Sequence, residues 1–377
     1  MTIWGRSRTS DGTEISAGRA KDGFGTLRLT AAFLVIVDHC APLTGSGGSV
    51  LPTRFGVDLG AVTVAAFMAL SGYQVMGSWQ RDPHVWRFAV RRLLRIMPGL
   101  AFLLLASVLV LGPVMTTLST SEYFAHPSTW TYLTNNLRVF PMQYSLPGVF
   151  PGNPVPNAVN GSLWSLPVEL LGYAMVVVLG LIGVVRRRFV VLLVALVLAA
   201  IFQRALTRQV KLPRITLEVL TLPLVQYLAI YCVGMAAYLY RDRIRFSWWG
   251  VAACVGVEIV MHGSAMVEIT RILTIPYIAL TVGTLMPRRL WLPSSITMAS
   301  YGVYLYGFPT QQFSVYIGAS QAWQVALISL PIAGVLGFLS WHLIEKQALK
   351  LRSALLPRRQ PAEPDRKPAR EPVDATT

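Results

Sequence analysis

The sequence predicts an all-α fold: a polytopic membrane bundle of about ten transmembrane helices with both termini in the cytoplasm. Hydrophobic residues make up 54% of the 377 residues and charged residues only 13%, whereas soluble domains carry about 25% charged residues. The apolar residues come in long blocks, which is typical of helices that cross a bilayer. Basic loops beside anionic lipid then explain the net charge of +16, and we expect no nucleic-acid partner.

Ten apolar segments are candidate spans. In chain order they cover residues 26–43, 57–79, 97–116, 163–184, 189–203, 217–240, 247–261, 269–286, 297–317 and 322–344. The fifth and the seventh are shorter than the ~20 residues that a straight span needs. An even number of spans puts both termini on the same side of the membrane.

The basic residues orient this predicted bundle. If the N-terminus is cytoplasmic, 26 of the 33 Lys and Arg residues fall in cytoplasmic segments, as the positive-inside rule requires. We therefore expect a multi-pass protein of the cell (inner or plasma) membrane, in contact with membrane lipid. Its parts are a cytoplasmic N-terminal segment (1–24), a membrane domain (25–350) with an external loop (about 117–161), and a disordered cytoplasmic tail (351–377).

Arg28 and His39 share one face of the first span. Eleven residues make almost three helical turns, so the two side chains lie about 16 Å apart along the axis. An ionisable side chain at the depth of His39 is costly, which favours a functional role, although a neighbouring helix could also satisfy it. Asp38 points elsewhere on the helix, as an orienting group for a different helix or as a polar residue near the interface.

Arginines cluster before the third span. Arg92 and Arg95 are three residues apart and share a helix face, with Arg91 beside them. Together with Arg28 they form a permanently charged group that suits phosphates. The alternative is a positive-inside anchor without a ligand.

The segment that leads into the fourth span is the third candidate. Glu169 lies about two turns into apolar sequence, where a carboxylate needs a partner. That partner is either His39 or an arginine of another helix. Trp164 stands where an interfacial aromatic belt is expected.

No disulfide framework and no metal site are predicted. The three cysteines lie in or beside apolar blocks without CxxC spacing. Cys40 is a possible nucleophile, but an apolar setting would leave its thiol inert.

These motifs together resemble the integral-membrane acyltransferase-3 family, over roughly residues 22–350. Arg28-x10-His39 and Arg92-x-x-Arg95 are similar to its arginine/histidine motifs. Supporting similarities are Phe67-Met-Ala-Leu-Ser-Gly-Tyr73, Gly161-Ser-Leu-Trp-Ser-Leu-Pro-Val-Glu169, Ser300-Tyr-Gly-Val-Tyr-Leu-Tyr-Gly-Phe-Pro309 and Trp341-His-Leu-Ile-Glu345. Two positions depart from the family pattern: Asp58 lies seven residues too early for the family's Gly-Val-Asp, and Gly307 stands where a histidine is frequent.

The resemblance implies transfer of an acyl group, usually acetyl from acetyl-CoA, to a hydroxyl of an extracytoplasmic sugar or lipid-linked glycan. Arg28, Arg91, Arg92 and Arg95 are the candidate acyl-CoA ligands. His39 is the candidate general base or acyl carrier, with Glu169 and Asp38 as further catalytic candidates. Candidate acceptor-binding residues are Tyr144, Asn160, Ser162 and Trp164.

Two other classes of protein also fit the sequence. A proton-coupled transporter or flippase of a small solute or glycolipid would use His39 and Glu169 as a proton relay. A structural or signalling membrane protein is the third class, but the short C-terminal tail resembles no signalling domain.

Overall fold

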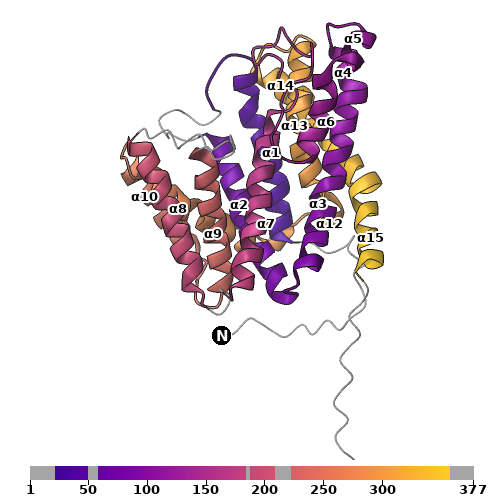
Figure 1. Ribbon diagram of the computed structural model, residues 1–377. Helices are drawn as coiled ribbons and strands as arrows, with labels where there is room; N and C mark the ends of the chain where they lie inside the picture. The colour runs from indigo at the N-terminus through magenta and orange to yellow at the C-terminus, as the bar shows by residue number, and fades with distance from the viewer. Residues whose placement is uncertain (1–21, 50–57, 184–186, 209–221, 357–377) are drawn as a thin grey trace, which may run out of the picture.

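The structure is a computed structural model that describes residues 22–49, 58–183, 187–208 and 222–356. Within these ranges the chain is helical, without a named β-strand, and two isolated β-bridges join loop residues. Figure 1 shows the helices packed side by side in one bundle. The predicted all-α class is confirmed.

Each of the ten predicted spans contains a helix. The long helices are α1 (Gly23–Leu43), α2 (Leu59–Arg81), α3 (Val85–Ala106), α7 (Ser165–Leu181), α8 (Phe189–Arg208), α9 (Leu222–Leu239), α10 (Trp248–Met261), α11 (Val267–Leu285), α13 (Ser300–Tyr316) and α14 (Ala322–Ser340). Shorter helices are α4 (Gly112–Met115), α5 (Thr120–Ala125), α6 (Pro127–Leu137), α12 (Ser294–Thr297) and α15 (Lys346–Leu355). A π-helix (Ser107–Leu111) joins α3 to α4, and another (Trp341–Glu345) joins α14 to α15.

Seven helices of the described chain are long and apolar enough to cross a membrane. They are α1, α2, the continuous run Val85–Met115, the run Gly161–Leu181, α8, α11 and the run Ala322–Arg352. Two further apolar helices, Pro223–Leu239 and α10, are shorter. The number of ten spans and the cytoplasmic position of the termini therefore stay predictions.

Two element boundaries differ from the sequence-based expectation. α3 begins at Val85 rather than near residue 97, because the arginine-rich segment before the apolar block is itself helical, and Arg is a good helix former. The predicted external loop contains α5 and α6, and a capping box between Ser119 and Glu122 fixes the start of α5. The pattern of hydrophobic blocks alone did not predict the polar first turns of α3, nor the helices α5 and α6.

Helices α2 and α9 run in the same direction. α2 and α9 pack side by side; Gly72 lies against the backbone of Tyr231, and Gly77 lies against the ring of Tyr238. Arg81, at the end of α2, therefore lies on the same end of the bundle as the connection after α9. We call this end, which also carries the α2–α3 turn and α15, the basic end.

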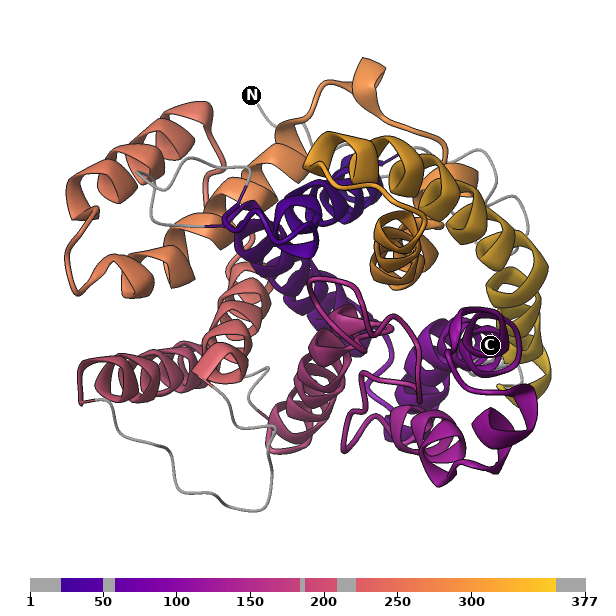
Figure 2. The same ribbon diagram turned by 90° about the horizontal axis from the view of Figure 1, so that it is seen from above.

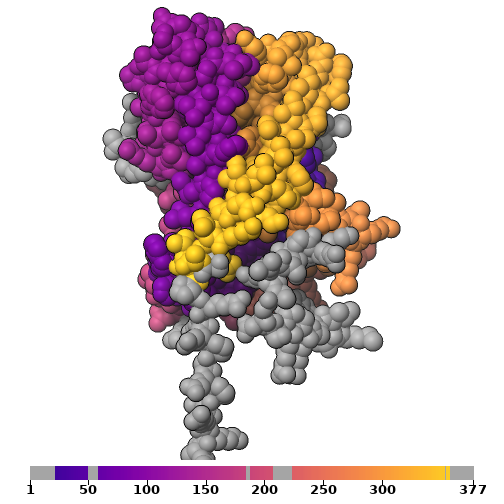
Figure 3. Space-filling model, turned by 90° about the vertical axis from the view of Figure 1, so that its right-hand side faces the viewer, coloured from indigo at the N-terminus to yellow at the C-terminus, as the bar shows by residue number. Residues whose placement is uncertain are grey.

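Helix α13 lies inside the bundle, where α14, α1 and α3 surround it (Figure 2). A Cβ atom on Gly302 would lie 2.8 Å from the Cα of Gly337, so α13 and α14 approach closely through glycine, as membrane helices often do. On the outer face, α14 descends to α15, which crosses α3 (Figure 3). α15 extends five residues past the predicted membrane domain, while residues 1–21 and 357–377 of the predicted terminal segments lie outside the described residues.

Candidate functional site

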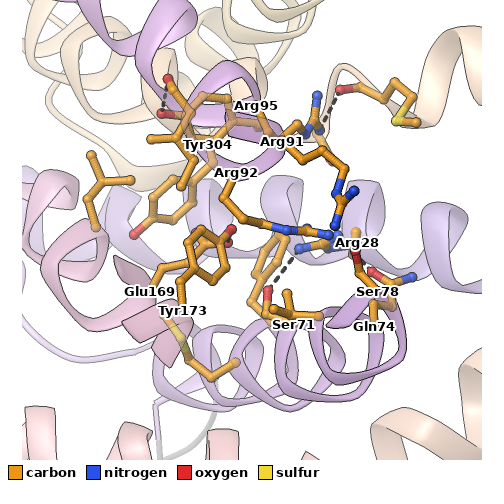
Figure 4. Close-up of a pocket in the computed structure, with 18 of the residues that line it drawn as sticks. Arg28, Ser71, Gln74, Ser78, Arg91, Arg92, Arg95, Glu169, Tyr173 and Tyr304 are labelled. Carbon is orange, nitrogen blue, oxygen red and sulfur yellow. Dashed lines mark hydrogen bonds between the residues drawn. The ribbon is translucent and has the colours of Figure 1, made fainter. Parts of the chain in front are cut away.

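A cavity of about 520 Å³ lies between the helices at the basic end. Side chains of α1, α2, α3, α7, α13 and α15 form its walls. The polar and charged lining residues include Arg28, Ser71, Gln74, Ser78, Arg81, Asp82, Arg91, Arg92, Arg95, Glu169, Tyr173, Tyr304 and Arg352. Figure 4 shows Arg28, Arg91 and Arg92 converging on the same space. All four arginines that the sequence predicted as donor ligands line this cavity.

Neutral partners hold the guanidinium group of Arg28. Its Nη1 donates to Oε1 of Gln74 and its Nη2 to Oγ of Ser71, each at 2.9 Å. Ser71, Gln74 and Ser78 are spaced three and four residues apart, so they form one polar stripe on α2. Arg28 has no ion pair within 4.0 Å among the described residues, although the charge of Glu169 attracts it and the charges of other cavity arginines repel it.

Arg92 also has no ion pair within the described chain. Its guanidinium carbon lies 5.5 Å from the ring centre of Phe88 and 5.7 Å from that of Tyr173. Its Nε is buried without a hydrogen-bond partner. Aromatic faces attract the cation but leave its donors unused. Arg92 thus brings to the cavity a positive charge that no described carboxylate contacts within 4.0 Å.

Carboxylates neutralise the other two arginines that the sequence predicts as acyl-CoA ligands, Arg91 and Arg95. Arg91 lies 2.5 Å from Oδ2 of Asp82, and this hydrogen bond, together with the nearby charges, lowers the pKa of the Asp82 carboxyl below its ordinary value. Arg95 pairs with Glu345 at 3.1 Å, and the Glu345 side chain is fully buried. The four arginines therefore divide into a paired set and an unpaired set, Arg28 and Arg92.

Glu169 lies in the cavity with the arginines. The hydroxyl of Tyr173, one turn further along α7, donates a 2.5 Å hydrogen bond to its Oε1. Among the described residues no hydrogen bond or ion pair joins Glu169 to His39. No arginine of the described residues forms an ion pair with Glu169 either, although its charge attracts Arg28 over a longer distance, so the partner of Glu169 stays a prediction.

His39 does not line this cavity. It lies about one helical turn further from the basic end than the lining residue Val64. Val64 lines the cavity, and Gly60 lies one turn before Val64 on the same face of α2. A Cβ atom on Gly60 would lie 3.1 Å from Cε1 of His39, so the imidazole packs against α2 at that level. α1 is helical from Gly23 to Leu43, which gives Arg28 and His39 a common face about 16 Å long.

The surroundings of His39 select one tautomer. Its Nδ1 lies 2.8 Å from the carbonyl oxygen of Val35. A carbonyl oxygen only accepts, so the neutral ring carries its proton on Nδ1 and keeps the lone pair on Nε2. His39 can therefore act as a base through Nε2.

Asp38 caps the helix that faces His39. One of its carboxylate oxygens accepts a 2.8 Å hydrogen bond from the backbone of Gly60, and the other accepts from the Ser49 hydroxyl. That hydroxyl in turn accepts from the backbone of Leu59 at 3.0 Å. A carboxylate at a helix N-terminus is stabilised by the unpaired N–H groups and the helix dipole. Of the two expectations for Asp38, the orientation of a different helix fits the structure.

Comparisons with known proteins agree with the resemblance that the sequence indicated. The family model that matches, described as an acyltransferase domain of the acyltransferase-3 type, covers residues 22–348. The chain belongs to this acyltransferase family. The predicted enzyme class is thereby confirmed, and a family of membrane acyltransferases agrees with the seven candidate spans.

Two curated relatives align with the acyltransferase along nearly its whole length. Nodulation protein 10 of Rhizobium leguminosarum bv. viciae is 28% identical over 373 residues, which cover 92% of this chain and 98% of the relative. The O-acetyl transferase of Shigella phage Sf6 is 26% identical over 345 residues, which cover 88% of this chain and 97% of the relative. No solved structure matches the chain.

The four predicted acceptor-binding residues of the acyltransferase lie outside the cavity lining. Asn160 is fully buried, donates to the carbonyl of Leu305 at 2.9 Å and accepts from the Ser162 hydroxyl at 2.6 Å. Trp164 packs on Tyr227 with ring centres 5.3 Å apart. Tyr144 exposes 38% of its surface. Their roles toward an acceptor stay predictions. The contacts of Asn160 and Ser162 fasten the segment before α7 to α13.

Several residues of the cavity were absent from the sequence-based site. The stripe Ser71, Gln74 and Ser78 carries a helical spacing inside an apolar segment, and this signal could have revealed it. Nothing local in the sequence indicates that Glu345 reaches Arg95, 250 residues away. The described residues contain no group of three or more His, Cys, Asp or Glu side chains that could hold a metal ion.

Proposed function

We propose that this acyltransferase is a membrane O-acetyltransferase, which takes an acetyl group from acetyl-CoA at the basic end and transfers it to a hydroxyl of a sugar or glycan. The relative from Shigella phage Sf6, named O-acetyl transferase, supports the reaction type. The observation that supports acetyl-CoA as the donor is that Arg28 and Arg92, neither of which has an ion pair among the described residues, lie in one cavity. Coenzyme A is a polyphosphate, and guanidinium groups bind phosphate oxygens through paired hydrogen bonds.

The cavity has the size and composition of a small-molecule site. Arg28, preorganised by Ser71 and Gln74, and Arg92, supported on two aromatic rings, would hold the phosphates. The thioester arm would then run along the shared face of α1 and α2 toward His39. The cavity ends about one turn short of His39, so the donor's reactive end and the imidazole would meet beyond Val64.

His39 is the proposed general base. Its Nε2 takes the proton of the acceptor hydroxyl as the hydroxyl oxygen attacks the thioester carbonyl carbon. The tetrahedral intermediate collapses, the carbon–sulfur bond breaks, and the CoA thiolate leaves and receives the proton. Transient acylation of His39 is the alternative route. Asp38 would act as a positioning residue, because it fixes the α2 turn on which the imidazole packs.

The acceptor would approach from the opposite end of the bundle, beneath the predicted external loop (about 117–161). Candidate residues in or next to its path are Tyr144, Asn160, Ser162 and Trp164. The excess of Lys and Arg in the segments assigned to the cytoplasm supports a basic end that faces the cytoplasm of a cell membrane. Donor and acceptor would then bind on opposite sides of the membrane.

The test uses the purified protein in nanodiscs, supplied with acetyl-labelled acetyl-CoA and glycolipid from the source cells. We expect the label to become covalently attached to glycan. Proton-coupled uptake of a solute into proteoliposomes, without any labelled glycan, would instead favour the transporter and contradict the proposal.

A further inference from the structure

A second cavity, separate from the donor cavity, lies between α8, α9 and α11 and holds about 350 Å³. Its walls are mainly aliphatic and aromatic, with Leu192, Val233, Ala237, Leu273 and Leu280 among them. It shares no lining residue with the donor cavity. Leu192 and Leu273 are 46% and 60% exposed, so the cavity opens as a groove on the surface of the bundle, which we call the groove. Apolar surface borders it, and such surface faces lipid in a membrane protein.

The groove ends at a basic rim. Its lining runs from Val233 on α9 to Tyr240 just after this helix, about two turns, and ends with Arg243 at the basic end. Arg241 and Arg245 flank Arg243, and this segment of three arginines contains a single acidic residue, Asp242. Arg243 is exposed and forms no ion pair with any described carboxylate.

The rim is held in place by aromatic residues. The hydroxyl of Tyr277 donates to the carbonyl of Arg245 at 2.9 Å. Arg241 lies 4.4 Å from the ring centre of Tyr238 and donates to its carbonyl. The connection after α9 is therefore fixed beside the groove.

We propose that this groove binds one anionic phospholipid of the leaflet at the basic end. An acyl chain fills the apolar groove between α8 and α11, and the phosphate lies against Arg243. An apolar slot that opens to lipid beside a cluster of arginines complements both halves of such a molecule. This site is independent of the proposed acyl transfer.

The first experiment measures lipid retention by native mass spectrometry. Protein is released from nanodiscs that contain equal amounts of phosphatidylglycerol and phosphatidylcholine. We expect wild-type protein to retain one phosphatidylglycerol, and Arg243→Gln to retain it about fivefold more weakly, the loss of one arginine–headgroup attraction. Arg289→Gln, which removes another exposed arginine outside the groove, serves as the control and should behave as wild type.

The second experiment fills the groove. Leu273→Trp places a large ring at its mouth and should abolish retention, whereas Leu327→Trp changes a residue that is 69% exposed on α14 and should not. Equal retention of phosphatidylcholine and phosphatidylglycerol by the wild type would overturn the proposal. So would unchanged retention in both Arg243→Gln and Leu273→Trp, or an equal loss in the two control variants.

Discussion

At the scale of single residues, the arginines differ in what already binds them. The sequence predicts Arg28, Arg91, Arg92 and Arg95 as phosphate ligands, with Arg92 and Arg95 as the most important of them. The structure pairs Arg91 with Asp82 and Arg95 with Glu345, which leaves the other two without a carboxylate. This division could not be predicted, because the partner of Arg95 lies 250 residues away. The shared face of Arg28 and His39 was predictable, since it depends only on helical spacing.

The unpaired arginines should dominate donor binding. Arg28→Gln and Arg92→Gln should each weaken CoA binding by about 10- to 100-fold, the range for losing a hydrogen bond to a charged group. Arg91→Gln, whose arginine is already neutralised by Asp82, should change the Kd much less. Calorimetric titration of the purified variants with CoA measures these constants. An effect of Arg91→Gln as large as that of Arg92→Gln would contradict the division.

The pair between Asp82 and Arg91 should make stability depend on acid pH. The folded-state pKa of Asp82 lies below the ordinary value of 3.8, mainly because of the Arg91 hydrogen bond. A lowered carboxyl pKa stabilises the folded state above 3.8, and this contribution is lost as the pH falls through the folded-state value. The thermal midpoint of wild type should therefore exceed that of Asp82→Asn at pH 7, and the difference should shrink below pH 3.8. A difference that persists unchanged at pH 3 would exclude this origin.

At the scale of elements, hydrophobic blocks predicted where helices lie better than where they end. All ten predicted segments contain helices, yet α3 begins twelve residues early, and α5 and α6 occupy the predicted loop. These segments are polar and helical, so a hydropathy pattern reports the membrane-crossing part and misses the rest. The sequence also did not predict which helices pack on one another, because this packing depends on which glycines of different helices lie in contact. Gly72 and Gly234 bring α2 and α9 into backbone contact.

Substituting Gly72 tests the contact between α2 and α9. A Cβ atom there would overlap the carbonyl group of Tyr231, so Gly72→Ala should destabilise the protein by about 1–3 kcal/mol, the usual cost of overpacking. Gly256→Ala on α10 is the matched control, because no atom lies within 4 Å of its Cβ position. That change should be neutral or stabilise the helix by up to about 1 kcal/mol. Thermal unfolding in detergent compares the two, and equal midpoints would contradict the close contact.

At the scale of the whole molecule, one helix face links the two ends of the bundle. The donor cavity opens at the basic end, and His39 lies further along the same face of α1 and α2, beside the turn that Asp38 caps. Both curated relatives align with almost the whole chain, so the family resemblance covers both ends. The sequence predicted the family and the candidate base. That Glu169 lines the cavity while His39 lies outside its lining is visible only in the three-dimensional arrangement.

We propose that His39 performs the acyl transfer and that the arginine cavity binds the acetyl-CoA donor. The most direct measurement is single-turnover acetyl transfer by His39→Ala, together with its Kd for CoA. The expected result is a loss of transfer of at least about 100-fold with an unchanged Kd. His262→Ala, which removes an exposed histidine after α10, should transfer acetyl at the wild-type rate. Transfer by His39→Ala at the wild-type rate would contradict the proposal.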